Sequence, residues 1–381
     1  MLYKNLGNTE IKIPAIAQGA SRIGSYSNFN PDEVNNRIKA IRYGIDMGMN
    51  FIDNAELYGG GFAEEVVGRV IEGVREKVFL ATKFNPRENV SESLTSSIEN
   101  SLRRLKTDYI DLYQIHWPNP AISLEQTMLA LSRLIEEGKV RFAGLSNFPV
   151  EDFMIAQSFF NCRLVSNQIE YNLLDRSAED ESLLYCRSQK VTLLAYSPLN
   201  QGIIFINDEQ KRVLLSIAEK YGKTVPQVIL RWLIKDPSVV VITRTKSIER
   251  VKENALSTEF ELMEEDILKI NELSKQNSIE VPVNSIRLNT STDKAIYTSL
   301  SEAIENRLDL IPSPVNLARI ISARKIIMPV RVHMTKPAEW NHTYDMDDYD
   351  IMDQVKKYWA WIIAYGYDKP IPVFVLNSIL H

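Results

Sequence analysis

Cysteine, histidine and long apolar runs are all scarce in this chain of 381 residues. The two cysteines, Cys162 and Cys186, are too few for a disulfide framework, and no Cys-x-x-Cys pair or Cys/His cluster indicates a metal site. No apolar run approaches the roughly 20 residues that a helix needs to cross a bilayer. The opening MLYKNLGNTEIKIP lacks the basic and then apolar layout of a signal peptide. These absences predict a cytoplasmic protein with no membrane partner and no metal.

Neither sign of charge dominates the chain. Its 44 Lys and Arg residues stand against 49 Asp and Glu residues, so the net charge is −5 and the pI is about 5.6. This balance gives no global reason to expect nucleic acid or an anionic membrane as the main partner. The hydrophobic content of 45% is that of a globular protein. The length allows one large domain or two.

Short apolar segments alternate with amphipathic helical segments from residue 1 to about 275. At the start, a Gly7-Asn8 turn between two short strand-like pieces predicts a hairpin. Eight repeated strand and helix units at this length favour a closed (β/α)8 barrel, the TIM barrel, in the α/β class. The eight predicted strands are 15–20, 50–55, 78–84, 109–117, 141–147, 164–170, 191–199 and 238–244.

An open, doubly wound parallel sheet is the alternative to the barrel. Such a sheet would be expected to carry a G-x-G-x-x-G turn after its first strand. The first predicted strand has no such turn, and GGGFAEE at 59–65 follows the second strand without the required spacing. The missing turn favours the barrel.

Four residues stand at the ends of three successive predicted strands: Asp53, Tyr58, Lys83 and His116. In a barrel, the carboxyl ends of the strands form the catalytic mouth. A phenol titrates near pH ~10, and a neighbouring ammonium held by a carboxylate lowers that pKa. An imidazole beside the phenol could position a substrate carbonyl. Taken singly, each residue could be a packing residue, a helix cap or a solvated surface charge. Together they predict a proton-donating site.

Further segments stand in the order and spacing of a known family. They are GLSNF (144–148), SNQIEYN (166–172), AYSPL (195–199) and ERVKEN (249–254). With the four residues above, the chain resembles the aldo-keto reductases over 1–275. The resemblance implies a (β/α)8 barrel, a nicotinamide cofactor and hydride transfer to an aldehyde or ketone, or from the corresponding alcohol. It makes Tyr58 the general acid, Lys83 and Asp53 the groups that tune it, and His116 the residue that orients the carbonyl.

The resemblance also implies a set of cofactor-binding residues. Ser146, Asn147 and Gln168 could hydrogen-bond the nicotinamide carboxamide, and the ring of Tyr196 could stack on the nicotinamide. Gly202 permits close approach of backbone to the pyrophosphate. The other members of this set are Gly19, Ser21, Asp53, Ser197, Leu199 and Gln201.

The segment 242–254 carries several cations around the predicted start of the last barrel helix. Arg244, Lys246 and Arg250 at a helix N-terminus suit a 2′-phosphate, which favours NADP(H) over NAD(H). The segment departs from the family pattern, because Thr243 and Arg244 replace a more usual Pro followed by Lys or Gly. Glu253 and Asn254 would then face the adenine, and the expected substrate contacts are Arg22, Tyr26 and Trp117.

At about residue 276 the alternation of strand and helix segments gives way to a polar, linker-like segment, and a new α+β pattern follows it. This change predicts a separate accessory α+β domain over 276–381. This domain faintly resembles the N-terminal domain of ParB-like and sulfiredoxin-like proteins, in 280–289, 326–333 and 365–375. It lacks that family's Gly-x-x-Arg turn, and its acidic loop 344–350 would repel phosphates, so nucleic acid is not an expected partner. The domain could instead form a homo-oligomer contact. A non-enzymatic redox sensor that binds the cofactor and signals through this domain is the alternative function.

Overall fold

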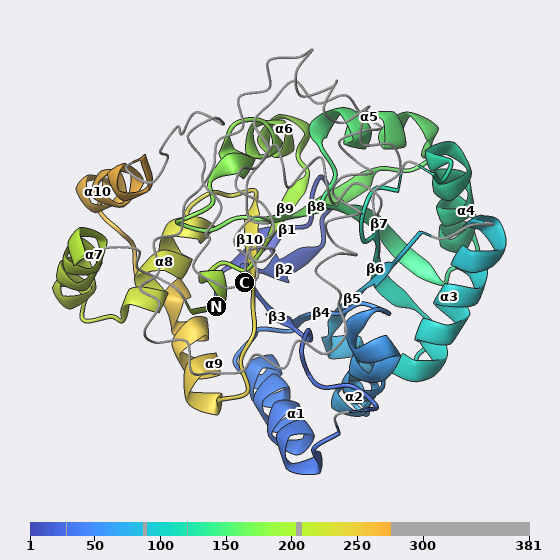
Figure 1. The fold of residues 1–381 in the computed structure, drawn as a ribbon, viewed down its shortest axis with the longest axis horizontal. Helices are drawn as coiled ribbons and strands as arrows, with labels where there is room; N and C mark the ends of the chain where they lie inside the picture. The colour runs from blue at the N-terminus through green and yellow to red at the C-terminus, as the bar shows by residue number, and fades with distance from the viewer. Residues whose placement is uncertain (28, 87–89, 120, 203–207, 276–381) are drawn as a thin grey trace, which may run out of the picture. The chain divides into compact units, whose positions relative to one another are not determined.

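The protein folds as a closed barrel of eight parallel strands with helices around it (Figure 1). This computed structural model describes residues 1–27, 29–86, 90–119, 121–202 and 208–275. Neighbouring strands follow the order β10-β3-β4-β5-β6-β7-β8-β9. The barrel strands are β3 (Ile16–Gly19), β4 (Phe51–Asp53), β5 (Phe79–Phe84), β6 (Ile110–Ile115), β7 (Val140–Ser146), β8 (Leu164–Glu170), β9 (Thr192–Tyr196) and β10 (Val239–Thr243).

The predicted (β/α)8 barrel is confirmed, and the alternative of an open sheet is wrong. Strand β10 pairs in parallel with β3 as well as with β9, which closes the sheet. The observed strands are mostly shorter than the predicted ones. For example, the sequence predicts a strand over 109–117 where β6 spans Ile110–Ile115. The His116 amide still donates to the Phe84 carbonyl oxygen at 2.8 Å, but Ile115 is the last residue of β6 paired in register with β5.

Helices connect the strands and cover the outside of the barrel (Figure 1). Helix α1 begins after the N-cap Asn30, whose side chain accepts from the Asp32 and Glu33 amides. The principal helices are α1 (Pro31–Asp46), α2 (Phe62–Ile71), α3 (Val90–Leu105), α4 (Leu124–Glu136), α5 (Val150–Phe159), α6 (Ser182–Gln189), α7 (Asp208–Tyr221), α8 (Val225–Ile234), α9 (Ile248–Ala255) and α10 (Glu264–Lys275).

The chain divides into two compact units, Met1–Asn271 and Glu272–His381. The first unit contains the barrel. The predicted accessory domain over 276–381, with its ParB-like segments, lies outside the described residues, so its fold and its boundary at residue 275 stay predictions. Among the described residues, no helix combines the length and the apolar character that crossing a membrane requires.

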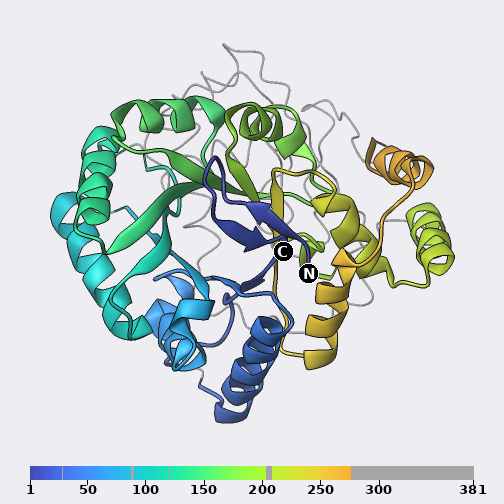
Figure 2. The same ribbon diagram turned by 180° about the vertical axis from the view of Figure 1, so that it is seen from behind.

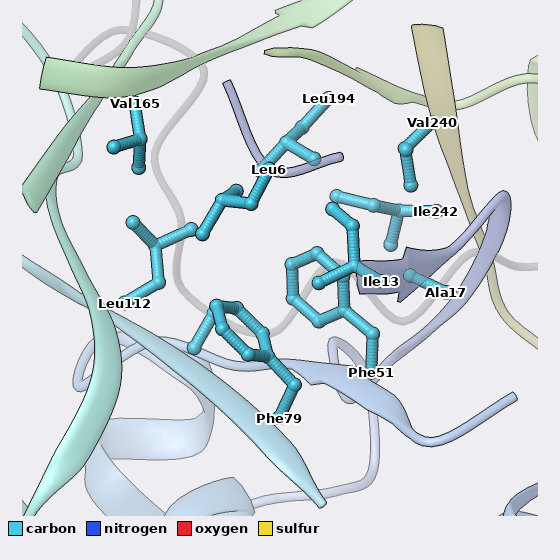
Figure 3. Packing of buried hydrophobic residues seen from close by; sticks show 11 residues of the cluster. Leu6, Ile13, Ala17, Phe51, Phe79, Leu112, Val165, Leu194, Val240 and Ile242 are labelled. Carbon is cyan, nitrogen blue, oxygen red and sulfur yellow. The ribbon is translucent and has the colours of Figure 1, made fainter. Parts of the chain in front are cut away.

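A hairpin of β1 (Tyr3–Asn5) and β2 (Lys12–Pro14) lies across the end of the barrel opposite the mouth (Figure 2). The predicted N-terminal hairpin is therefore confirmed. Leu6 and Ile13 of this segment are fully buried among residues from the strands. Figure 3 shows both side chains pointing into the cluster, beside Phe51 and Phe79 from the first positions of β4 and β5. The hairpin thus seals the barrel and completes its apolar core.

Lys4 fixes the hairpin to the barrel by a polar contact. Its buried ammonium donates to the backbone carbonyls of Ile234, Asp236 and Val239 at 2.7, 2.6 and 2.5 Å. An ammonium has three N–H donors, so these carbonyls use all of them. The contact ties the start of the chain to the segment that leads into β10.

We expect Lys4→Met to lower the free energy of unfolding by about 2–4 kcal/mol, because it leaves three buried carbonyls without a donor. Lys12→Met is the matched control, since Lys12 is an exposed residue of the same hairpin. Chemical denaturation of both variants measures the difference. Equal stability of the two variants would contradict the role given to Lys4.

Candidate active site

The four residues expected at the mouth do lie together at the carboxyl ends of neighbouring strands. Asp53 ends β4, Lys83 is the penultimate residue of β5, and His116 follows β6 directly. Tyr58 begins a short 3-10 helix, η1 (Tyr58–Gly61), in the connection after β4. Parallel strands β4, β5 and β6 are consecutive neighbours in the barrel, so their ends open at the same face.

Lys83 is the centre of the group. Its side chain is fully buried, and its ammonium contacts both carboxylate oxygens of Asp53 at 2.8 and 2.9 Å. The same nitrogen lies 2.8 Å from the Asn54 carbonyl oxygen and 3.2 Å from the Tyr58 hydroxyl. The ammonium therefore bridges a carboxylate and a phenol, the arrangement expected from the sequence.

Glycines let the loop that carries Tyr58 pack closely against the loop after β3. Gly59 has a φ of 60°, in the left-handed region that favours glycine. A Cβ atom built on Gly59 would lie 2.2 Å from the Gly24 carbonyl oxygen. No side chain fits in that space, so the two loops contact each other through backbone.

Burial controls the protonation of Tyr58. It raises the pKa of the phenol above its ordinary value, and the positive charge of Lys83 opposes this without reversing it. The expected lowering of the Tyr58 pKa is therefore wrong in its net direction. For Lys83, burial lowers the pKa, but Asp53 and Tyr58 together more than compensate, so the net pKa is raised. The pair at neutral pH is a protonated phenol beside an ammonium.

His116 presents its ring to Tyr58 from the end of the next strand. The ring centroids are 5.8 Å apart and the planes meet at 80°, an edge-to-face contact. On its other side His116 stacks with Trp117 at 6.2 Å and 24°. The imidazole is 8% exposed, so a small group bound at the mouth could contact both it and the phenol.

Three of the expected nicotinamide contacts form one hydrogen-bonded group at the ends of β7 and β9. Asn147, with a φ of 63°, donates from Nδ2 to the His116 carbonyl oxygen at 3.1 Å and to Ser146 Oγ at 3.0 Å. Its Oδ1 accepts from the Tyr196 hydroxyl at 3.0 Å. The amide of Asn147 thus joins protein groups and holds three strand ends together.

Gln168 connects the amide group of the mouth to the buried ion pair. Its Nε2 donates to Asp53 Oδ1 at 2.8 Å, although the two residues are 115 positions apart in the chain. Gln168 Oε1 accepts no hydrogen bond from the described residues. Gln168 in β8 lies next to Ser146 in β7, because the two residues are paired in register. Gln168 Oε1 and Ser146 Oγ are the groups of this set that remain for a ligand.

The segment after β9 carries the residues expected near the pyrophosphate. Ser197 has a φ of 51° and Leu199 precedes the 3-10 turn η4 (Asn200–Gly202). Gln201 lies in this turn, and the Gly202 amide donates to the Leu199 carbonyl at 2.8 Å. Residues 203–207 lie outside the described residues. At the end of β3, Gly19 pairs in register with Asp53, and Ser21 lies two residues further on.

The basic residues expected at the 2′-phosphate are not gathered in one place. Arg244 follows β10, and its charge acts on Tyr58 at the mouth. Lys246 pairs with Glu33 of α1 at 2.6 Å, and both side chains are more than half exposed. Arg250 is exposed in the first turn of α9, whose N-cap Ser247 accepts from the Arg250 amide at 3.2 Å.

The residues expected near the adenine lie in the same helix as Arg250. The Glu253 carboxylate accepts from the Thr224 hydroxyl at the start of α8. Asn254 is 5% exposed. Glu253 therefore already links α9 to α8, and Asn254 reaches the surface only in small part.

The three expected substrate residues differ in their solvent exposure and in their contacts with other residues. Tyr26 is exposed, its hydroxyl donates to Glu65 at 2.6 Å, and its ring contacts Phe62 edge-on at 5.3 Å. Trp117 is 39% exposed beside His116. Arg22 is exposed and has a φ of 53°, a strained conformation for a residue with a side chain.

Two residues with a part in the site were not among those expected. Asn54 binds Lys83 through its backbone carbonyl, a contact that any residue could make and that leaves no signal in the sequence. Arg37 of α1 is a buried guanidinium that donates to the Ser21 carbonyl at 3.1 Å. An arginine on the apolar face of an amphipathic helix is the signal that could have found it.

Known proteins resemble this chain throughout the barrel. Residues 15–275 match the Aldo/keto reductase family. Methylglyoxal reductase YeaE of Escherichia coli (strain K12) is 36% identical over 255 residues, which cover 66% of this chain and 88% of the relative. Glyoxal reductase of Bacillus subtilis (strain 168) is 36% identical over 254 residues, covering 66% and 88% respectively.

Solved structures show the same likeness. A thermostable aldo-keto reductase, Tm1743, in complex with the inhibitor epalrestat has a TM-score of 0.68 and 38% identity, and the match covers 72% of this chain and all of that one. An aldo/keto reductase from Klebsiella pneumoniae in complex with NADP and acetate has a TM-score of 0.65 and 34% identity, with 71% and 95% covered. The chain belongs to the aldo/keto reductase family and is an enzyme of its NAD(P)H-dependent carbonyl reductase type.

Proposed function

We propose that the protein is an NADP(H)-dependent oxidoreductase that reduces an aldehyde or ketone, or oxidises the corresponding alcohol, with Tyr58 as general acid and base. One observation carries this proposal: Lys83 contacts Asp53 and the Tyr58 hydroxyl at the mouth, with the His116 ring alongside. A phenol in this setting can give a proton to a carbonyl oxygen and take it back in the reverse direction.

The residues at the mouth fit a nicotinamide cofactor. Ser146 Oγ and Gln168 Oε1 provide a donor and an acceptor for a carboxamide, and the half-buried ring of Tyr196 offers a stacking surface. The turn that ends at Gly202, which has a φ of 102° and open space where a Cβ would lie, lets a pyrophosphate approach the backbone closely. When bound, the cofactor supplies the hydride.

The protein's own groups supply the proton and the geometry. Tyr58 donates its proton to the carbonyl oxygen, and the Lys83 ammonium stabilises the phenolate that remains. Asp53 holds Lys83 in place, and His116 orients the carbonyl beside the phenol. Because burial keeps Tyr58 protonated, the donor is ready at neutral pH.

Several relatives support the choice of cofactor and substrate. A Klebsiella pneumoniae aldo-keto reductase was solved with NADPH, and the enzyme from that organism in complex with NADP was described above. Two relatives are named for methylglyoxal and glyoxal. We propose small aldehydes of this kind as the first substrates to examine, and NADPH as the preferred reductant.

The role of residues 276–381 stays a prediction. The sequence suggests an accessory domain that could mediate a homo-oligomer or carry a redox signal. Turnover and cofactor binding must be measured separately, because a non-enzymatic sensor would bind NADPH without reducing any carbonyl.

We expect Tyr58→Phe to lower kcat for methylglyoxal reduction by about 10²–10⁴-fold while the affinity for NADPH is retained, because only the proton donor is lost. Absorbance of NADPH measures turnover, and calorimetry measures binding. Tyr3→Phe is the control, since its hydroxyl contacts the Gly48 carbonyl far from the mouth. Equal rates in wild type and Tyr58→Phe would refute the mechanism, and a wild type that binds NADPH without turnover on an aldehyde panel would favour the sensor.

The pH profile provides an independent check of the Tyr58 environment. Reduction needs the protonated phenol, and its pKa is raised above the ordinary value of about 10. The active form therefore persists as pH rises and is lost only above that value. We expect no fall in kcat caused by Tyr58 between about pH 7 and pH 9. A loss with a midpoint below about pH 8 that disappears in Tyr58→Phe would show that the pKa is lowered instead.

Cofactor choice can be examined at the first turn of α9. We expect Arg250→Ala to raise KM for NADPH by about tenfold and to leave KM for NADH unchanged, because only NADPH carries the 2′-phosphate. The N-cap bond from the Arg250 amide to Ser247 survives this change. Lys252→Ala, an exposed residue of the same helix, is the control. Equal effects on both cofactors would remove Arg250 from the phosphate site.

A further inference from the structure

A buried carboxylate outside the barrel wall has no part in the mechanism proposed so far. Glu64, in the first turn of α2, is fully buried. Its Oε1 accepts from the Thr82 hydroxyl of β5 at 2.6 Å, and its Oε2 accepts from Arg104 Nε at 2.7 Å. Arg104 lies in α3, beside α2 (Figure 1). Glu64 therefore joins two helices to one strand of the barrel.

Glu64 is connected to both residues of the contact between Tyr58 and Lys83. Thr82, which donates to Glu64, directly precedes Lys83 in β5. Side chains alternate between the two faces of a strand, so Thr82 points out of the barrel where Lys83 points in. Tyr58 begins η1, and α2 follows η1 without a break at Phe62. The Glu64 carboxylate thus ties the segment that carries Tyr58 to the strand that carries Lys83.

Arg104 also contacts the segment that carries Tyr58. Gly61, the last residue of η1, has a φ of 100°. A Cβ built on Gly61 would lie 2.8 Å from both Cδ and Nε of Arg104, so the arginine side chain packs against the Gly61 backbone. Because Glu64 holds the Arg104 guanidinium, the place of the Gly61 backbone depends on this ion pair.

A second glutamate holds the other end of the same segment. The Glu56 carboxylate accepts from the amide of Asn85, the residue after β5, at 3.0 Å. Tyr58 therefore lies between two attachments, Glu56 before it and Glu64 after it. A segment attached at one end only can turn about that end, so the place of the Tyr58 hydroxyl requires both.

The separation that these attachments hold tolerates little change. Lys83 Nζ and the Tyr58 hydroxyl are 3.2 Å apart, at the long end of the range for hydrogen bonds. A displacement of about 0.5 Å that moves the two groups apart would break this contact. Misplacement of a reacting group by about 1 Å can lower a rate on the order of 100-fold.

We propose that Glu64, held by Thr82 and Arg104, is a positioning residue that sets the distance between Tyr58 and Lys83. Because it is buried outside the barrel, it acts on the reaction only through the segment Tyr58–Gly61 and through β5. The proposal rests on the proposed function, in which Tyr58 gives the proton and Lys83 stabilises the phenolate.

Steady-state kinetics with NADPH and methylglyoxal form the first arm of the test. The variants of the full-length protein are Glu64→Gln, Thr82→Val and Thr82→Ser. Thr82→Val removes the hydroxyl that donates to Glu64, and Thr82→Ser restores it. Tyr113→Phe is the local control, because the buried Tyr113 hydroxyl has no hydrogen-bond partner among the described residues. Burial and the charges of Glu56 and Glu64 raise the Tyr113 pKa, which places this control in the same buried region.

We expect Glu64→Gln to lower kcat by about tenfold or more and to leave KM for NADPH within about twofold of wild type, because Tyr58 moves while the residues of the cofactor site stay in place. Thr82→Val should lower kcat in the same way, and Thr82→Ser should recover most of the loss. If Glu64→Gln does not fold, the comparison of Thr82→Val with Thr82→Ser decides. The proposal fails if the folded variants change kcat by no more than about twofold, if Tyr113→Phe has the same effect, or if KM for NADPH rises as much as kcat falls.

Hydrogen exchange measures the attachment of the segment without turnover. The Tyr58 and Gly60 amides donate to the Ala55 and Leu57 carbonyls at 3.1 and 3.2 Å, so their exchange reports how firmly the segment is held. We expect Glu64→Gln to speed exchange of these two amides by about tenfold or more relative to wild type.

Asp111→Asn is the control for a general loss of stability. Asp111 is a buried carboxylate near the start of β6, paired with Arg75 and Arg141 at 2.9 and 2.6 Å. The proposal fails if Glu64→Gln speeds exchange of the Tyr58 amide no more than Asp111→Asn does. Failure of the proposed function looks different, because a wild type that reduces no aldehyde would still show this difference in exchange between the two variants.

Discussion

The buried ion pair between Lys83 and Asp53 is the interaction on which the candidate active site depends. Both charges are withdrawn from water, with exposures of 0% and 3%. Such a pair is stable only when its remaining hydrogen-bonding capacity is satisfied, and removing one partner costs about 3–5 kcal/mol. Asn54, Tyr58 and Gln168 satisfy it here. The requirement to complete the pair therefore brings residues from β4, β5 and β8 to one point.

The same ion pair explains how a buried phenol can still release its proton. Burial alone makes the phenolate costly, and this holds Tyr58 in its neutral form. The ammonium 3.2 Å from the hydroxyl reduces the cost of ionisation at the moment when the proton leaves. A protonated resting state beside a charge that favours loss of the proton is what the general acid that we propose would need.

The sequence was sufficient for the barrel because the barrel depends on local patterns. Strand β8, for example, coincides with its predicted range of 164–170. Asp53, Lys83 and Tyr58 could be grouped because parallel strands bring equivalent ends together.

Two kinds of feature could not be predicted from the sequence: contacts made through the backbone, and the net direction of a pKa shift that several opposing effects determine. The Tyr58 pKa depends on how much water burial removes, a property of the whole mouth. Arg244, Lys246 and Arg250 are close in sequence, yet they point to different partners because β10 ends at Thr243 and α9 begins only at Ile248. Arg37 is distant in sequence from Arg244, and only the closure of β10 on β3 makes them neighbours.

The contact between Gly59 and Gly24 has a consequence for how this enzyme can change over evolutionary time. The loop that carries Tyr58 and the loop that carries Arg22 touch through backbone, with no side chain to absorb a displacement. A substitution that reshapes one loop must therefore move the other. New substrate preferences are consequently harder to acquire through the loop after β3 than through more distant loops of the mouth, because changes in that loop also displace Tyr58.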